Sequence, residues 1–490
     1  MKKLLLILAG VSLLSLSSLK GQDSGPEIDP EGDFFTNFFK PEYTIVFGDG
    51  SNQGDRGSDL KASYDVIRYR VDPRYELIFV GEYPQARFAS FVVYDDYLAT
   101  TDYIRDFELK PLKWFYQNHF RSNIQYKEDQ LYAGVISFGG GEPNPDTILP
   151  GCSLEGYNVR DNFLDASKRN ESVSWNHEEN LPAWVPPYIG GDNLAGTITF
   201  RRFIKGEDNG ILPLARPVVI VREVATGQAL TQLEAFQKGI VFFNDAYLEP
   251  FLPQLEIWTL KWYNEVFQPK KCYWPDPESD IYWTRGTEHV AAGNPDSGYL
   301  SAEIPTWIMP PLLSGERFIR LRFKLPVMAK LPTTGEIMTG NEELRYWSLS
   351  FQVDPVTLAT ISDDELILDP DGYVNLIIGL GGTAPAYVTP ENFYTFFDFS
   401  ELEGYENVRA MAIRTILPDV DFCGSAQSVP FKTSEHNPMG GFMGEYVPVV
   451  DYPLVADLPE VAEQPLPHPE SCGVLPPPFP PPFNCVIETE

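Results

Sequence analysis

Two short segments that both begin with an arginine constrain the fold of this chain more than any other feature. RYWSLSFQV spans residues 345–353, and RFASFVVYD spans residues 87–95. Side chains alternate between the two faces of a strand. Arg345 shares one face with Trp347, Leu349, Phe351 and Val353, and Arg87 shares one face with Ala89, Phe91 and Val93. The pattern predicts a buried strand in each segment, and aligning Arg87 with Arg345 keeps the two patterns in step.

The likeness continues beyond these two strands. Residues 97–109 (YLATTDYIRDFEL) align roughly with residues 357–368 (TLATISDDELIL) through a shared Leu-Ala-Thr and the acidic residues that follow it. A strand that ends in glycines comes next in each half, at residues 132–141 and 373–382. The spacing before that strand is longer in the first half, so the sequence predicts a duplicated β unit whose first copy carries an insertion.

Short runs rich in Val, Ile, Phe and Tyr, separated by many Gly and Pro residues, predict an all-β fold that is mostly an antiparallel β-sandwich. Helical spacing of apolar residues in 226–238 predicts one amphipathic helix. We expect a signal peptide at 1–21, a first β-sandwich unit with a long loop insertion at 22–225, a helical or irregular bridge at 226–280, a second β-sandwich unit at 281–448 and a Pro-rich tail at 449–490.

The N-terminus predicts export to a secreted or periplasmic location. Lys2 and Lys3 precede an apolar run at residues 4–16, and small residues lead to a cleavage site near Gly21. No other stretch is long and apolar enough to span a bilayer. A net charge of -32 repels phosphate backbones and anionic lipids, so we expect no nucleic-acid partner.

The cysteines and carboxylates predict no metal site and no cofactor. The chain has 5 Cys, none in a spacing typical of zinc. A disulfide between Cys472 and Cys485 would have to close a stiff proline-rich loop, so we expect one tail cysteine to pair with the body, at Cys423. The acidic loop that ends at Asp59 lacks the EF-hand spacing and is interpreted as a plain turn.

No catalytic motif is present, so the catalytic residues are unknown. Nucleophile elbows, phosphate loops, dinucleotide fingerprints and HExxH are all absent. The 5 His are widely spaced, and His119 is interpreted as a packed residue. One functional hypothesis is nevertheless a secreted hydrolase or lyase acting on an extracellular polymer. Its pocket would hold a histidine, His289 or His436, or two carboxylates at reacting distance.

The hypothesis we favour is a non-catalytic protein that binds a glycan, a small molecule or a protein partner. Aromatic and amide side chains on sandwich loops suit sugar stacking and hydrogen bonding, and such a protein should expose aromatic residues at a loop end. An arginine that leads an apolar face either binds an anion in a groove or is tied structurally to a carboxylate or to loop carbonyls. The candidate ligand-binding residues are Asn294, Asp296, Tyr299, Arg345 and Tyr346.

Several motifs of the second half resemble a group of uncharacterised bacterial secreted proteins that carry paired all-β domains of unknown function. The motifs, in chain order, are GNPDSGYLSAEI (293–304), ELRYWSLSFQ (343–352), DPDGYVNLIIG (369–379), AIRTILPDVDF (412–422) and GFMGEYVP (441–448). The resemblance covers mainly residues 282–448, with a fainter echo in 60–225, and implies a β-sandwich fold without an established activity. The long loop region of the first half and the Pro-rich tail depart from that group.

Overall fold

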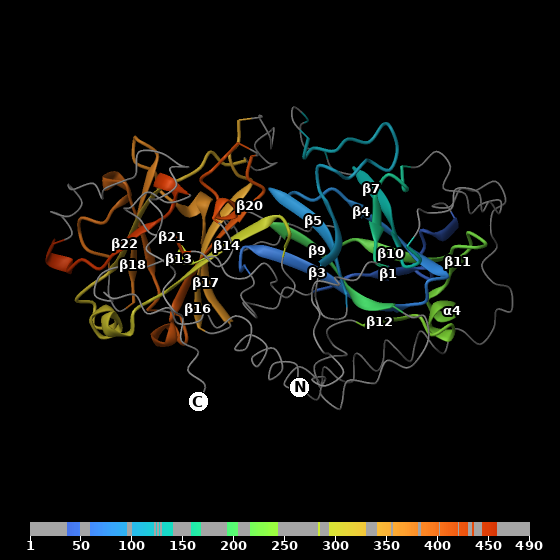
Figure 1. Cartoon of the computed structure of the whole chain (residues 1–490), viewed down its shortest axis with the longest axis horizontal. Coiled ribbons are helices and arrows are strands. Elements are labelled where there is room, and N and C mark those ends of the chain that lie inside the picture. Colours follow the sequence, from blue (N-terminus) through green and yellow to red (C-terminus); the bar gives the residue numbers. More distant parts are fainter. Residues whose placement is uncertain are drawn as a thin grey trace, which may run out of the picture.

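The chain folds into two β-sandwiches that lie side by side (Figure 1). The structure is a computed structural model. It describes residues 37–49, 59–95, 100–121, 124, 127, 130–140, 158–167, 194–203, 216–243, 283–284, 294–329, 341–353, 356–380, 384–400, 402–419, 421–429, 434–435 and 443–457. We call the sandwich built from residues 37–243 unit 1 and the sandwich built from residues 283–457 unit 2.

Each unit has one sheet that faces the other unit, which we call its junction sheet, and one distal sheet. Junction sheet 1 has the strand order β12-β3-β9-β5-β6, with β2 paired to β3, and distal sheet 1 has the order β1-β10-β4-β7-β8, with β11 paired to β10. The bounds are β1 (Thr44–Val46), β2 (Gly48–Asp49), β3 (Ala62–Val71), β4 (Tyr75–Glu82), β5 (Phe88–Asp95), β6 (Thr100–Arg105), β7 (Leu131–Ser137), β8 (Phe163–Asp165), β9 (Leu194–Phe203), β10 (Val218–Glu223), β11 (Ala229–Leu230) and β12 (Val241–Phe243).

Unit 2 repeats this plan. Junction sheet 2 has the order β17-β16-β20-β14-β13-β21, and distal sheet 2 has the order β19-β18-β15-β22. The bounds are β13 (Trp283–Thr284), β14 (Ser297–Glu303), β15 (Ile319–Lys324), β16 (Tyr346–Val353), β17 (Val356–Ser362), β18 (Tyr373–Gly379), β19 (Tyr394–Asp398), β20 (Ala410–Ile416), β21 (Ser434–Glu435) and β22 (Val449–Asp451).

Eight strands of unit 1 correspond one to one with eight strands of unit 2. The order β6-β5-β9-β3 in unit 1 matches β17-β16-β20-β14 in unit 2, and β8-β7-β4-β10 matches β19-β18-β15-β22. The pairs β7–β8 and β18–β19 are both parallel, at the same place in an otherwise antiparallel sheet. The all-β fold class and its two-unit organisation are therefore confirmed, and the two arginine-led strands are equivalent.

The strand register changes one part of the expected alignment. Ser90 pairs with Arg105 in unit 1, and Ser348 pairs with Ser362 in unit 2, so Arg105 is the equivalent of Ser362. The Leu-Ala-Thr match would have placed Arg105 opposite Glu365 instead. Both strand pairs contain a register shift near their far end, which hides the correct spacing from a comparison of the sequence alone.

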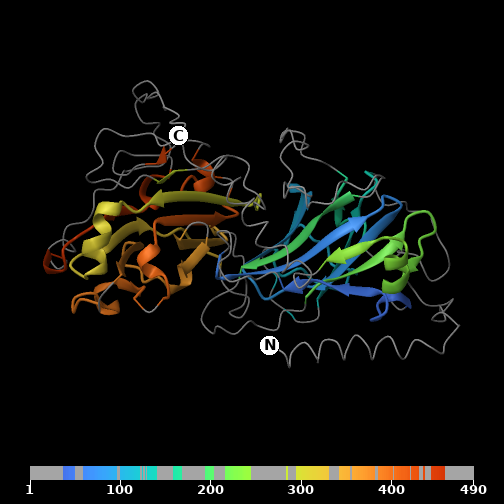
Figure 2. The same cartoon turned by 90° about the horizontal axis from the view of Figure 1, so that it is seen from below.

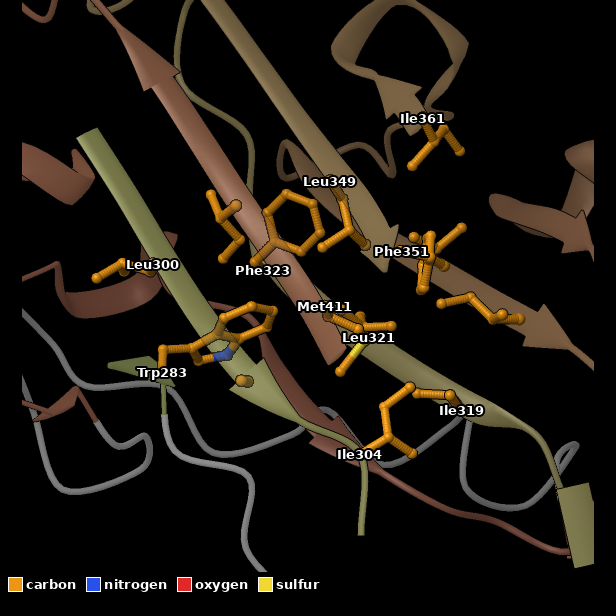
Figure 3. Packing of buried hydrophobic residues seen from close by; sticks show 14 of the residues in the cluster. Trp283, Leu300, Ile304, Ile319, Leu321, Phe323, Leu349, Phe351, Ile361 and Met411 are labelled. Carbon is orange, nitrogen blue, oxygen red and sulfur yellow. The ribbon is translucent and has the colours of Figure 1, made fainter. Parts of the chain in front are cut away.

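Each unit has its own hydrophobic core between its two sheets. In unit 2 the core includes Trp347, Leu349 and Phe351, and the ring of Trp347 stacks on Phe323 of the distal sheet at 4.8 Å. Figure 3 shows side chains of both sheets converging in this core, among them Leu321. The apolar face that alternation predicts for 345–353 is thus the core face, and Trp347 is a core residue.

Helices are few and short in the described part of the chain. The α-helices are α4 (Gln232–Gln237) and α7 (Met309–Leu313), and the 3-10 helices are η3 (Thr306–Ile308), η5 (Asp363–Glu365), η6 (Pro390–Asn392), η7 (Tyr405–Asn407), η8 (Ala426–Ser428), η9 (Gly444–Tyr446) and η10 (Val455–Asp457). None of the helices described is long and apolar enough to cross a membrane.

The region expected to bridge the units begins as part of unit 1. Strands β11 and β12 pair with β10 and β3 beyond residue 225. The expected helix over 226–238 is shorter than predicted, because α4 begins only after the capping box of Thr231 and Glu234. Helix α4 lies at the end of unit 1 that is remote from unit 2 (Figures 1 and 2).

Some expectations concern residues outside the described ranges. These are the signal peptide, the Pro-rich tail beyond residue 457, and four of the cysteines. Cys423 is described and is disulfide-bonded.

Candidate functional site

The two units meet through the outer faces of their junction sheets, near the ends where β5 and β16 begin. We call this contact the junction. Its apolar part is a cluster of four buried residues, Phe88, Phe203, Tyr346 and Ile416. The rings of Phe203 and Tyr346 lie 5.0 Å apart and join unit 1 directly to unit 2.

Two buried carboxylates occupy equivalent positions directly after β6 and β17. An oxygen of Asp106 accepts the backbone N–H of Ala89 at 2.7 Å, and an oxygen of Asp363 accepts that of Trp347 at 3.4 Å. Each carboxylate therefore accepts a backbone N–H at the start of the arginine-led strand in its own unit, and Asp106 also accepts the backbone N–H of Phe107 at 2.6 Å.

The two arginines identified from the sequence cross the junction. Arg87 forms an ion pair with Asp363 of unit 2, with both side chains buried. Arg345 lies 3.7 Å from Asp106 of unit 1 and donates to the carbonyl oxygens of Arg87 at 3.0 Å and of Phe120 at 3.1 Å. These contacts match the structural alternative for the arginines, a tie to a carboxylate and to loop carbonyls.

Burial governs the protonation of the two junction carboxylates. Removal from water raises the pKa of Asp106 to about 7, while the nearby Arg345 guanidinium opposes that rise. Burial raises the pKa of Asp363 as well, and Arg87 opposes it in the same way. The charge of each carboxylate therefore depends on an arginine that belongs to the other unit.

Asp59 is the centre of a polar contact that the sequence did not reveal. Its carboxylate accepts from the Tyr346 hydroxyl at 3.0 Å and from the Ser348 hydroxyl at 2.7 Å, and it lies 3.0 Å from the Arg414 guanidinium. The Arg414 guanidinium also lies over the ring of Tyr299 at 5.1 Å. A loop residue interpreted only as part of a turn thus anchors unit 2 to unit 1.

The rim of the junction carries two more ion pairs. Lys61 bonds to Glu365 at 2.9 Å, and the Nε of Arg105 bonds to Asp296 at 2.5 Å. Burial raises the pKa of Asp296, and its bond to Arg105 counteracts that rise. Both pairs join unit 1 to unit 2.

The structure brings all five predicted ligand-binding residues to this one region. Asp296, Arg345 and Tyr346 contact unit 1 directly, Tyr299 packs on Arg414, and Asn294 begins the turn that carries Asp296. Asp296, Arg345 and Tyr346 bond to unit 1, and the side chain of Asp296 has no exposed surface. A ligand role for these five residues stays a prediction.

A second candidate site lies on the surface of unit 1, between β6 and β7. Trp114 is 90% exposed and Phe115 is 53% exposed, and their rings meet edge to face at 5.7 Å. We call these two residues the aromatic platform. A large indole left in water costs hydrophobic free energy, so an exposed pair of aromatic rings marks a candidate binding surface.

The aromatic platform is held rigidly on both sides. Before it, the buried Leu112 donates its N–H to Leu131 of β7 at 2.8 Å. After it, the Asn118 amide donates to the carbonyls of Asp106 and Leu109 at 2.7 and 2.8 Å. The backbone of this short loop is therefore hydrogen-bonded on both sides of the two rings.

His119, which follows the aromatic platform, is a packed residue as predicted. Its ring is buried beside Phe120, and its Nε2 lies 3.0 Å from the Pro84 carbonyl oxygen, which requires the proton on Nε2. Burial lowers the pKa of His119 to about 4. A buried imidazole in this state contributes to stability rather than to proton transfer near neutral pH.

The depressed pKa of His119 gives a testable pH dependence. The unfolded chain takes up a proton as the pH falls through about 6.5, whereas the folded chain does so only near 4, so stability is lost within that window. We expect the parent chain to lose about 2 kcal/mol more than His119→Gln between pH 7 and pH 4.5. Urea denaturation at both pH values measures the difference, and an equal loss in the two proteins would contradict the assignment.

The described residues contain no group of three or more His, Cys, Asp or Glu side chains placed to hold a metal ion. His289 and His436, the residues named for a hydrolase or lyase, lie outside the described residues. That hypothesis is therefore untested by the structure.

Comparisons with known proteins add little to this description. No protein-family model matches the chain, and no curated protein sequence matches it. It is similar to a crystal structure of an uncharacterised protein from Burkholderia cenocepacia, with 11% identity, a TM-score of 0.44, and coverage of 86% of this chain and 84% of that chain. The fold and the junction define the class of this protein as two β-sandwiches of equivalent topology joined in one chain.

Proposed function

We propose that this chain is a secreted, non-catalytic protein that binds a glycan through the aromatic platform. The observation that carries the proposal is the 90% exposure of Trp114 beside the half-exposed Phe115, on a loop fixed at both ends. Flat aromatic faces stack on the apolar faces of sugar rings, and preformed placement reduces the entropy lost on binding.

Charge narrows the class of glycan. The net charge of -32 gives the whole molecule a strong repulsion for polyanions, so a sulfated or uronic acid polymer is a poor ligand. A neutral polysaccharide does not meet this repulsion and can be held by stacking and hydroxyl hydrogen bonds. We therefore assign the aromatic platform to neutral glycans.

The test is binding of the purified chain to soluble neutral polysaccharides. Affinity gel electrophoresis against xylan, mixed-linkage β-glucan and glycogen, with dextran sulfate as the anionic comparison, should show retardation by at least one neutral polymer. Trp114→Ala should weaken that binding by about tenfold or more, because the ligand loses contact with an indole face. Unfolding curves of parent and variant should coincide, since the side chain is exposed.

Trp307→Ala is the matched control. Trp307 of unit 2 is 49% exposed and packs edge-on against Tyr452 at 5.9 Å, so it is a surface tryptophan away from the aromatic platform. Its replacement should leave glycan binding unchanged. Equal binding by the parent and Trp114→Ala, or no retardation by any neutral polymer, would contradict the proposed function.

A further inference from the structure

The ion pairs of the junction are reciprocal, as in a dimer of identical subunits. Arg87 and Arg345 are equivalent, and so are Asp106 and Asp363, because each arginine precedes the same strand and each carboxylate follows the next. Arg87 of unit 1 pairs with Asp363 of unit 2, and Arg345 of unit 2 pairs with Asp106 of unit 1. In a two-fold symmetric contact, residue i meets residue j and residue j meets residue i.

The turns that lead into β3 and β14 are equivalent too. The Oδ1 of Asp59 accepts the backbone N–H of Lys61 at 2.8 Å, and the Oδ1 of Asn294 accepts that of Asp296 at 3.1 Å. Strands β3 and β14 then pair in the same register with β9 and β20. Lys61 and Asp296 therefore occupy equivalent positions in the two units and carry opposite charges.

A glutamate at the rim completes the equivalence. The backbone N–H of Arg105 donates to Glu108 at 2.9 Å, and that of Ser362 donates to Glu365 at 2.9 Å. Since Arg105 and Ser362 are equivalent by strand register, Glu108 and Glu365 hold the same position in the two units.

The rim contacts lie at reciprocal positions, but the residues that form them differ between the two rims. Lys61 meets Glu365 at 2.9 Å. At the opposite rim Asp296 occupies the position of Lys61, and Arg105 bridges it to Glu108, at 2.5 Å and 3.2 Å. One rim is thus a simple ion pair, whereas the other needs an arginine between two carboxylates.

The centre of the junction also departs from two-fold symmetry. The Asp59 carboxylate accepts from Ser348, whereas the equivalent turn of unit 2 has Asn294 in place of the aspartate, and the equivalent of Ser348 in unit 1 is Ser90. The buried Nδ2 of Asn294 and Oγ of Ser90 have no hydrogen-bond partner among the described residues. The half of the junction that contains Asn294 therefore has no carboxylate at the position where the other half has Asp59.

From these contacts we propose that the junction is a two-fold dimer interface retained within one chain, and that its rim selects the partner. The face of unit 2 fits the face of unit 1 and rejects a second copy of itself. In a pair of two unit 2 faces, Asp296 would meet Glu365 without Arg105, and Arg414 would meet Asn294 in place of Asp59. Repulsion between like charges and the lost buried partner both oppose that pairing.

The first experiment measures the contact in the full-length chain. A protease site is introduced within residues 244–282 and the folded protein is cut there. The pieces are followed by native mass spectrometry and sedimentation in rising NaCl, with a thiol reductant present because Cys423 is disulfide-bonded. We expect a complex of one unit 1 with one unit 2 that persists at micromolar concentration. Separation of the pieces under these conditions at physiological salt would overturn the proposal.

Charge exchange tests the partner selection. Lys61→Glu and Glu365→Lys should each weaken the complex by about threefold to tenfold, and the two together should return it to within about twofold of the parent. Lys110→Glu is the matched control, because its ion pair with Asp161 lies within unit 1. Additive losses in the double variant would contradict the reciprocal pairing.

Copying the turn of unit 1 onto unit 2 tests the rejection of a second copy. Asn294→Asp combined with Asp296→Lys gives unit 2 the Asp-x-Lys turn of unit 1. After cutting, this variant should yield pairs of unit 2, which the parent should not form. If either cut protein loses its fold, the exchange of Lys61 and Glu365 is instead assessed in the uncut chain as the urea midpoint, where recovery supports the proposal and additive loss overturns it.

Discussion

Replacing Arg87 with methionine is expected to lower the free energy of unfolding of the chain by about 3–5 kcal/mol. Arg87 and Asp363 are 7% and 3% exposed, so the replacement leaves a carboxylate buried with no opposite charge beside it. Breaking a buried pair costs more than the pair contributes, because the desolvation of the remaining charge is no longer compensated. Urea denaturation at pH 7, followed by tryptophan fluorescence, measures the loss.

Two variants separate this effect from the loss of an arginine in general. Arg87→Met combined with Asp363→Leu should recover most of the stability, since no buried charge is left. Arg74→Met removes an arginine that pairs with Asp72 at 2.8 Å on the surface and should change stability little. A small loss in Arg87→Met, or no recovery in the double variant, would show that the junction does not depend on this pair.

Replacing Trp347 with alanine is expected to destabilise the chain by about 3–5 kcal/mol. The side chain is 1% exposed and packs on Phe323 in the core of unit 2, so alanine leaves a cavity the size of an indole. The same urea measurement applies. Trp114→Ala, which removes an equally large but exposed side chain, is the control and should leave the urea midpoint unchanged.

An unchanged midpoint in Trp347→Ala would contradict the core assignment. If Trp347 instead held a ligand, its replacement would abolish binding while leaving the fold intact. Comparing Trp347→Ala with Trp114→Ala in both the stability and the glycan assay therefore separates the two roles of tryptophan in this chain.

Alternation along single strands was enough to predict the fold class and the core faces. The face of Trp347 and its equivalent in unit 1 are buried as the pattern indicates, and aligning Arg87 with Arg345 identified equivalent strands. The later alignment of the acidic segments was less reliable, because register shifts in both strand pairs change the spacing without changing the composition.

The sequence did not show what covers the opposite face. Every residue of β5 is buried, and its outer face carries Phe88, Val92 and Tyr94, so its apolar residues lie on both faces. The cover at the start of β5 comes from the other unit, where Phe88 joins a buried cluster with Tyr346. Contacts such as Tyr346 with Asp59 depend on the packing of two separate sandwiches. The small serines on the outer face of β16 were the available signal, since they allow a second sheet to approach closely.

The alternation of apolar residues also could not predict the aromatic platform. Residues 113–120 are irregular in the part that carries the rings. Which aromatic residue of such a segment points outward depends on its anchors, here the buried Leu112 and Asn118. The composition of the segment does not indicate which of Trp114 and His119 is exposed. In the structure Trp114 is exposed and His119 is buried.

The reciprocal contacts of Arg87 and Arg345 have a consequence for how this gene can change. Asp59 and Tyr346 bond across the junction although 287 positions separate them in the chain. A mutation of a residue that bonds across the junction therefore also changes the surroundings of its partner in the other unit. Residues on the two junction faces are expected to change together.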